Sequence, residues 1–120
     1  MTKEELKDRT KKFALRIIKL FRALPKSLDA QVIGKQLLRS GTSVAANYRA
    51  VCRAKSTADF LSKLATVEEE TDESCFWLEI IIESNIMDRD LVQPLLIEAN
   101  ELVAIFVSSI NTKKNSKYLK

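Results

Sequence analysis

Apolar residues recur at spacings of three, four and seven in four separate segments of this chain, with two small polar residues on the stripe of the third. The repeat is built from these positions: Leu6, Phe13, Ile17, Leu20 and Leu24; Ile33, Leu37, Val44, Tyr48 and Val51; Phe60, Leu64, Val67, Thr71, Ser74, Leu78 and Ile81; and Leu95, Ala99, Leu102 and Phe106. Such a period places one apolar stripe on each of four α-helices. Because 120 residues include only 2 Gly and 2 Pro, the chain also lacks the turn residues that an all-β fold needs. The sequence therefore predicts an all-α fold.

Capping signals and short connections set the expected bounds of the helices. Thr2 followed by Glu5 matches a capping box, and Pro25 ends the first helix because the residue before a proline disfavours the α conformation. The expected helices, with further caps at Ser27, Ser56 and Asp90, are residues 3–24, 28–55, 57–85 and 91–111. Connections of a few residues make successive helices antiparallel neighbours. We therefore predict an antiparallel up-down-up-down four-helix bundle over residues 1–111, followed by a basic, flexible tail over residues 112–120.

The predicted helices carry more apolar surface than one bundle core can use. In residues 75–82 only Glu79 is polar, so Phe76 and Trp77 cannot both face one core. Residues 102–107 are apolar without interruption. We expect the second apolar face to pack on another copy of the chain, which makes the protein a homo-oligomer. Two alternatives would also account for the second apolar face: a helix that lies on a membrane surface, and a single core thick enough to bury both faces.

The second predicted helix carries Gly34, Gly41 and Ala45 along one side. A glycine inside a helix costs about 1 kcal/mol relative to alanine, so we expect these small residues to permit a close contact between helices. An adjoining polar stripe is either solvated or hydrogen-bonded inside the assembly; its members are Gln36, Ser40, Ser43 and Asn47. The candidate oligomer-interface residues are Gly41, Ser43, Asn47, Phe76 and Trp77.

Charge is divided unevenly along the chain. Residues 1–63 hold 15 basic and 5 acidic side chains, a net charge of +10, whereas residues 64–120 hold 5 basic and 11 acidic side chains, a net charge of −6. A basic face on the first two helices could hold phosphate backbones, unless the acidic third helix neutralises it. The candidate residues for binding nucleic acid or a partner are Lys12, Arg16, Lys19, Arg39, Arg49 and Arg53.

The chain offers little of the chemistry that enzymes use. It has no histidine, which excludes Ser-His and Cys-His catalysis, helix-borne zinc motifs and the Glu-x-x-His sites of di-iron bundles. Cys52 and Cys75 have no pairing motif, and the single glycines at 34 and 41 form no phosphate-binding loop. We expect a protein without catalytic activity, bound metal, cofactor or small-molecule substrate.

The start of the chain is charged over residues 1–9 and lacks the apolar region of a secretory signal. No apolar run approaches the roughly 20 residues that span a bilayer. These features predict a soluble cytoplasmic protein with no membrane partner.

Two long stretches resemble one known family. They read RSGTSVAANYRAVCRAKSTADFLSKL over residues 39–64 and VEEETDESCFWLEIIIES over residues 67–84, and they resemble the four-helix-bundle proteins also called 23S rRNA intervening-sequence proteins. The resemblance implies a small bacterial protein, an up-down four-helix bundle and a ring-like homopentamer. The Ser-x-x-x-Asn feature of the family falls on Ser43 and Asn47, and the basic positions after it fall on Arg49 and Arg53.

A related protein supports an alternative function. The accessory variability protein of diversity-generating retroelements is a basic pentamer that partners a reverse transcriptase and its nucleic acid. Many family members read Asn-Ile-Ala-Glu-Gly where this chain reads Asn-Tyr-Arg-Ala-Val over residues 47–51, so this chain looks like a separate branch. We therefore predict a non-catalytic, pentameric interaction protein. The alternative is an RNA- or DNA-associated module that uses the basic faces of the first two helices.

Overall fold

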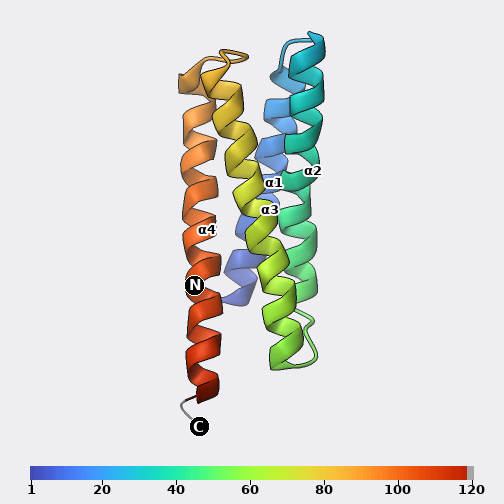
Figure 1. Ribbon diagram of the computed structural model, residues 1–120. Coiled ribbons are helices and arrows are strands. Elements are labelled where there is room, and N and C mark those ends of the chain that lie inside the picture. The colour runs from blue at the N-terminus through green and yellow to red at the C-terminus, as the bar shows by residue number, and fades with distance from the viewer. Residues whose placement is uncertain (119–120) are drawn as a thin grey trace.

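Four helices make up the fold, and each follows the apolar period of its own segment. The computed structural model describes residues 1–118, with helices α1 (Lys3–Ala23), α2 (Leu28–Val51), α3 (Thr57–Glu83) and α4 (Arg89–Tyr118). Successive helices run antiparallel and form an elongated bundle of 54 × 21 × 21 Å (Figure 1). No strand occurs among the described residues. The predicted all-α, up-down-up-down four-helix bundle is confirmed.

Three helices begin at the caps that the sequence predicted: Thr2, Ser27 and Ser56. Ser27 precedes α2 without a side-chain capping hydrogen bond. The Glu5 amide donates to Thr2 Oγ1 at 3.0 Å and the Thr2 amide donates to Glu5 Oε1 at 3.3 Å, which completes the capping box of α1. Leu24 caps the other end of α1 with extended backbone, as expected for a residue before proline. The start of α3 is capped because the Asp59 amide donates to Ser56 Oγ at 3.0 Å.

The connection between α2 and α3 is longer than predicted. α2 ends at Val51 rather than near residue 55. A tight turn follows, in which the Arg53 amide donates to the Ala50 carbonyl and the Ala54 amide donates to the Val51 carbonyl, each at 3.1 Å. These bonds span three residues instead of four and so end the α-helical pattern.

The connection between α3 and α4 lies earlier than predicted. Asn85, two residues after the end of α3, has a φ of 60°, a left-handed conformation that asparagine adopts more readily than most residues. Asp88 rather than Asp90 caps α4, because the Leu91 amide donates to the Asp88 carbonyl at 3.0 Å and the Asp90 amide donates to Asp88 Oδ1 at 3.4 Å. Pro94 therefore lies inside α4, beyond its first turn.

α4 is longer than its apolar pattern predicted. The expected end near residue 111 is wrong, because the helix continues to Tyr118. Residues 112–116 contain no glycine or proline, and lysines near the C-terminus of a helix interact favourably with its dipole. Lys113 Nζ also lies 5.4 Å from the centre of the Phe60 ring. Residues 119–120 of the predicted tail lie outside the described residues, and its flexibility stays a prediction.

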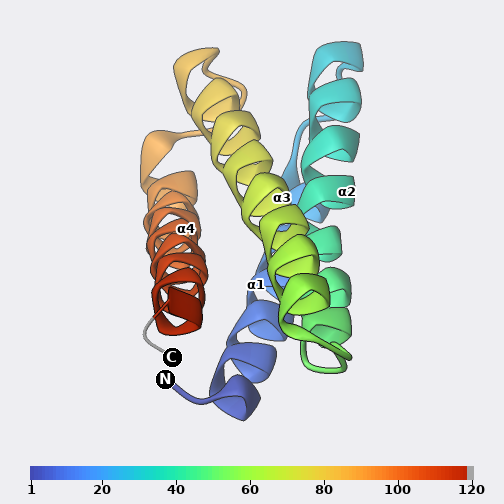
Figure 2. The same cartoon turned by 60° about the horizontal axis from the view of Figure 1, so that its bottom comes forward.

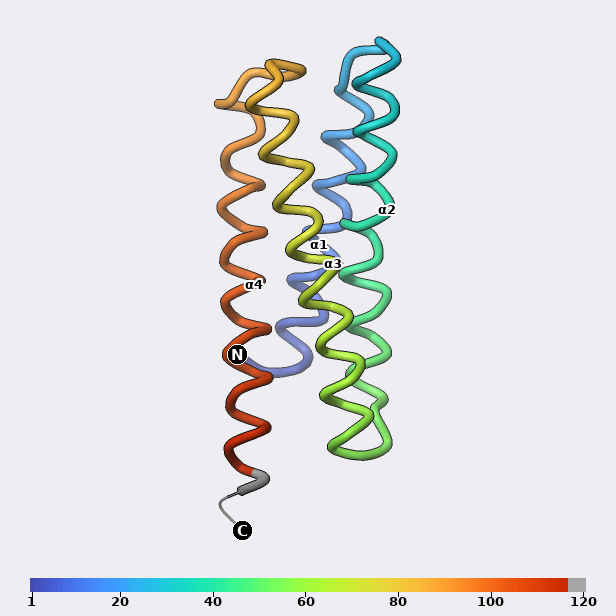
Figure 3. Tube along the Cα trace, in the orientation of Figure 1, coloured from blue at the N-terminus to red at the C-terminus, as the bar shows by residue number. Residues whose placement is uncertain are grey.

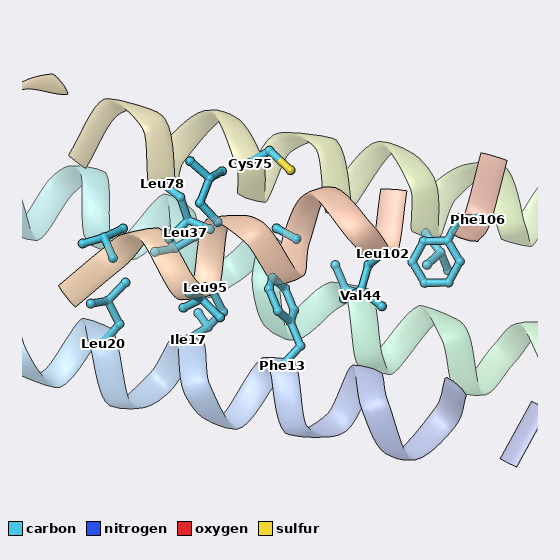
Figure 4. Packing of buried hydrophobic residues seen from close by; sticks show 14 of the residues in the cluster. Phe13, Ile17, Leu20, Leu37, Val44, Cys75, Leu78, Leu95, Leu102 and Phe106 are labelled. Carbon is cyan, nitrogen blue, oxygen red and sulfur yellow. The ribbon is translucent and has the colours of Figure 1, made fainter. Parts of the chain in front are cut away.

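The core runs along the bundle and is built from the predicted stripes. Figure 4 shows a continuous row of core residues along the bundle, from Ile17, Leu20, Leu37, Leu78 and Leu95, past Phe13 and Cys75, to Val44, Leu102 and Phe106. Ser40 of the predicted polar stripe is fully buried, and its hydroxyl bonds the Ser74 hydroxyl of α3 at 2.9 Å. Among the described residues no buried side-chain oxygen or nitrogen lacks a hydrogen-bond partner, as a well-packed core requires.

Gly34 and Gly41 bring α2 close to α1. A Cβ atom at Gly41 would lie 2.7 Å from Ile17 Cγ1, and one at Gly34 would lie 2.6 Å from Leu24 Cδ1. The predicted close contact between helices is confirmed, and it lies within one chain. Gly41 is buried in this contact within one chain, and its place in an oligomer interface stays a prediction.

The first and last helices are joined more loosely than the other neighbouring pairs. Figure 2 shows α3 between α2 and α4, with α4 standing to one side. The chain begins beside the C-terminal half of α4 (Figure 3), where Met1 lies near Ser108. One bidentate ion pair spans the two helices: Arg9 Nε donates to Glu98 Oε2 at 2.8 Å and Arg9 Nη2 donates to Glu98 Oε1 at 2.7 Å. We call this boundary the α1–α4 seam.

Candidate interaction surfaces

Large apolar side chains face solvent on all four helices. Those exposed in the described part of the chain include Leu15, Leu28, Val32, Phe76, Leu91, Ile97 and Val107. Scattered exposed apolar residues are ordinary on the surface of a single chain. Phe76 and Leu91 differ because each lies on a surface with a defined charge.

The outward face of α3 is an acidic stripe that contains one aromatic residue. Asp72, Phe76, Glu79 and Glu83 follow one another at spacings of four, three and four, so they share one side of the helix. All four are exposed, and half of the Phe76 surface, 50%, is accessible to solvent. Residues 64–83 include no basic side chain. We call these four residues the α3 stripe.

Trp77, the second predicted aromatic residue, is half-buried beside the stripe. Its ring packs edge-on to Phe76 with centroids 4.9 Å apart, and its Nε1 donates to Glu73 Oε2 at 3.0 Å. Arg39 Nη2 donates to the same oxygen at 2.8 Å and to Glu70 Oε2 at 3.1 Å. The Trp77 and Arg39 hydrogen bonds lower the pKa of Glu73. Arg39, predicted for nucleic-acid binding, is thus neutralised by α3.

A groove opens in the α1–α4 seam beside the C-terminal half of α1. Its volume is about 330 Å³. It is lined by Arg16, Lys19, Leu20, Ala23, Met87, Leu91, Pro94 and Leu95. Arg16 and Lys19 are exposed, and within the described residues neither forms an ion pair. This seam groove is therefore apolar with a basic rim and no acidic lining residue.

A second groove, between α1 and α2, is basic. Lys7, Lys11 and Arg49 line a hollow of about 410 Å³ together with Ala45 and Ala46. In the part of the chain that the structure describes, none of the three cations forms an ion pair. Arg49 was predicted from the sequence, whereas Lys7 and Lys11 were missed, although their spacing of four places them on one helix face. We call this hollow the basic groove.

The six basic residues predicted for binding do not form one surface. Two line the seam groove, and Arg49 lines the basic groove. Lys12 pairs with Asp8 of its own helix at 2.9 Å. Arg53 is exposed just beyond the end of α2.

Ser43 and Asn47, predicted for the oligomer interface, are both half-buried on α2. Asn47 Nδ2 donates to the Ser43 carbonyl at 2.8 Å, along the helix. The pair therefore satisfies part of its hydrogen bonding within the chain, and a role between chains stays a prediction.

The described residues hold no group of three or more His, Cys, Asp or Glu side chains that could bind a metal ion. Burial raises the pKa of the Cys75 thiol to about 11, and the charges of Asp72 and Glu79 add to the effect. Such a thiol is protonated at neutral pH and is a weak nucleophile.

α4 is apolar beyond its core face. Among the described residues, Arg89–Ser116 is the one helical segment that is long and apolar enough to cross a membrane by length and composition, and 33% of its apolar window is buried in the bundle. A core helix meets the same criteria, and Glu98 holds this helix to α1 through Arg9. The apolar surface in excess of the core includes Leu91, Ile97 and Val107.

These features define a class of protein, the all-α antiparallel four-helix bundle, here with an acidic stripe and two grooves that carry basic residues. The model of the 23S rRNA-intervening sequence protein family matches residues 3–108. The chain belongs to this family, which confirms the resemblance seen in the sequence.

A solved structure supports the same assignment. The crystal structure of a protein of unknown function from the S23 ribosomal protein family of Bacteroides thetaiotaomicron is 34% identical to this chain, with a TM-score of 0.85. The similarity covers 92% of this chain and 99% of that one. No curated protein is significantly similar to this chain. Because the solved relative has no known function, a function has to be argued from the surfaces described above.

Proposed function

We propose that the protein is a non-catalytic homo-oligomer, a pentamer by its family resemblance, whose outer surface docks a partner. The exposure of Phe76 and Leu91 on two surfaces of opposite charge carries the proposal. Fully burying a leucine or phenylalanine side chain is worth about 1.5–3 kcal/mol. Association itself costs about 4–15 kcal/mol, so several exposed apolar residues must be covered together. Phe76 on α3 and three residues on α4, Leu91, Ile97 and Val107, are exposed apolar residues that such an interface would cover.

Trp77, the single tryptophan of the chain, can test this proposal by its fluorescence. It is half-buried in one chain, so we expect acrylamide to quench it weakly in the assembled protein and more strongly once dilution dissociates the assembly. N-acetyltryptophanamide in the same dilution series supplies the fully exposed limit. Quenching at the level of a half-exposed residue, and equal at every protein concentration, would contradict the proposal.

The basic groove favours a second function, binding of RNA or DNA through the phosphate backbone. Three cations, Lys7, Lys11 and Arg49, line one hollow without ion-pair partners in the described residues. Phosphate contacts release counterions, so such binding weakens steeply with added salt. Against a larger basic surface, Arg39 is neutralised by Glu70 and Glu73.

Charge reversal in the basic groove tests this second function. We expect Lys11→Glu/Arg49→Glu to weaken binding of labelled RNA and DNA, and to reduce the salt slope by about 1 for each phosphate contact removed. Fluorescence anisotropy at low and moderate salt measures both. Lys26→Glu/Lys35→Glu is the matched control, because both lysines are exposed and neither lines the groove. Equal affinity of the two variants, or no complex with the wild type at low salt, would exclude the groove as the site.

A further inference from the structure

We infer that the α3 stripe of one copy binds the seam groove of the next copy. The inference rests on the homo-oligomer proposed above and names the two surfaces that meet. One surface is an exposed aromatic residue among carboxylates, and the other is an apolar hollow with a basic rim. The aromatic side chain of one surface can fill the hollow of the other, and the carboxylates can pair with the basic rim.

The charges of the two surfaces are complementary. The stripe carries Asp72, Glu79 and Glu83, and α3 has no basic residue from 64 to 83. The groove carries Arg16 and Lys19, and none of its lining residues is acidic. Since the described residues provide these two cations with no ion pair within the chain, they are free to meet carboxylates of another copy. A second copy of this chain supplies those carboxylates at helical spacing.

The apolar parts of the two surfaces also match. Phe76 is 50% exposed at the centre of the stripe, with acidic residues on both sides along the helix. Leu91, which lines the groove, is 67% exposed. Insertion of Phe76 into the groove would cover both side chains at once. Flanking Glu79 would then lie near the basic rim.

Parts of both surfaces lie near the same level of the bundle. Leu95 lines the groove, and Figure 4 shows Leu78 of α3 near the level of Leu95. Phe76 and Glu79, two members of the stripe, lie within two residues of Leu78 in the sequence. The part of the stripe around Leu78 therefore lies near the level of Leu95 in the groove.

The proposed contact is compatible with a closed ring. The contact joins two different surfaces, so each copy has one stripe and one groove to offer its neighbours. Such a heterologous interface forms a ring when its rotation closes and a helical filament when it does not. A ring needs a contact that adds no net rise along the axis, and a ring is the closed form of the homo-oligomer proposed above.

Charge reversal tests the pairing. We expect Arg16→Glu/Lys19→Glu to shift the particle from the assembled mass to that of one chain, 13.6 kDa, and Glu79→Lys/Glu83→Lys to do the same. The four substitutions combined should restore assembly, because the charges are again opposite. Light scattering measures the masses, and Lys35→Glu/Arg53→Glu, which touches neither surface, is the matched control that should keep the wild-type mass.

The outcomes separate this inference from the function on which it rests. A monomeric wild type would overturn the homo-oligomer and the inference together. An assembled wild type whose mass is unchanged by Arg16→Glu/Lys19→Glu would overturn only the pairing of stripe and groove. A photo-crosslinking amino acid at position 76 of the otherwise native chain decides the matter even if a charge variant fails to fold: crosslinks between chains to residues 16–23 or 87–95 support the inference, and crosslinks elsewhere overturn it.

Discussion

Replacing Phe106 with alanine is expected to lower the free energy of unfolding by about 3–5 kcal/mol. Phe106 has 0% of its surface exposed, and its ring centroid lies 5.9 Å from that of Tyr48 on α2. Truncation would leave a cavity between α4 and α2 that the bundle can only partly close. Since most domains are stable by about 5–15 kcal/mol, this one change would remove a large part of the total.

Denaturant unfolding followed by circular dichroism measures the loss. Val107→Ala is the matched control, because Val107 is the next residue in α4 but is 39% exposed, and its truncation should cost less than about 1 kcal/mol. All variants are compared at one protein concentration, since assembly makes apparent stability depend on concentration. Equal stability of Phe106→Ala and Val107→Ala would show that the core face of α4 is assigned wrongly.

Gly41→Val is expected to be the next most damaging substitution, with a cost of about 1–3 kcal/mol or more from overpacking. Its Cβ would lie 2.7 Å from Ile17 Cγ1 and 2.9 Å from Ile17 Cγ2. Ile17 is fully buried, so it has no space into which to move. The clash forces α1 and α2 apart, and we expect a lower midpoint of thermal and denaturant unfolding.

Gly34→Ala is the control for this substitution. The atoms nearest to its Cβ belong to the far ends of the Leu24 and Phe21 side chains. Leu24 is buried, but a terminal methyl moves by rotation about one side-chain bond, and Phe21 is only partly buried. Alanine also gains about 1 kcal/mol of helix propensity over glycine, which offsets the adjustment. We expect Gly34→Ala to stay within about 1 kcal/mol of the wild type. A Gly41→Val protein as stable as Gly34→Ala would contradict the close contact of α1 with α2.

The helices were predictable because the spacing of three and four between apolar residues continues along the core face of each helix. Leu37, Leu78 and Leu102 each fall on the stripe that the spacing predicts, and each is fully buried. The ends of the helices were less predictable. Asp88 and Asp90 are equally good caps, and the choice between them depends on how the chain turns at Asn85 after leaving α3. The end of α4 was missed because helix propensity continues after the apolar period stops.

The surfaces were less predictable. The apolar period shows on which face of its own helix a residue lies, but it does not show which residues of a neighbouring helix that residue will contact. Arg39 was expected on a basic surface, but the packing of α2 on α3 places it against Glu70 and Glu73. Lys7 and Lys11 join Arg49 only after α1 packs on α2. The excess of apolar residues around Phe76 was visible in the sequence, whereas the seam groove needs the arrangement of α1 and α4.

The mass of the native particle is the most direct test of the central claim, that copies of this chain cover one another's exposed apolar surfaces. One chain weighs 13.6 kDa. Size-exclusion chromatography with multi-angle light scattering should give a single species at an integral multiple of that mass, five chains by the family resemblance. A single monodisperse particle of 13.6 kDa at every protein concentration measured would contradict the claim.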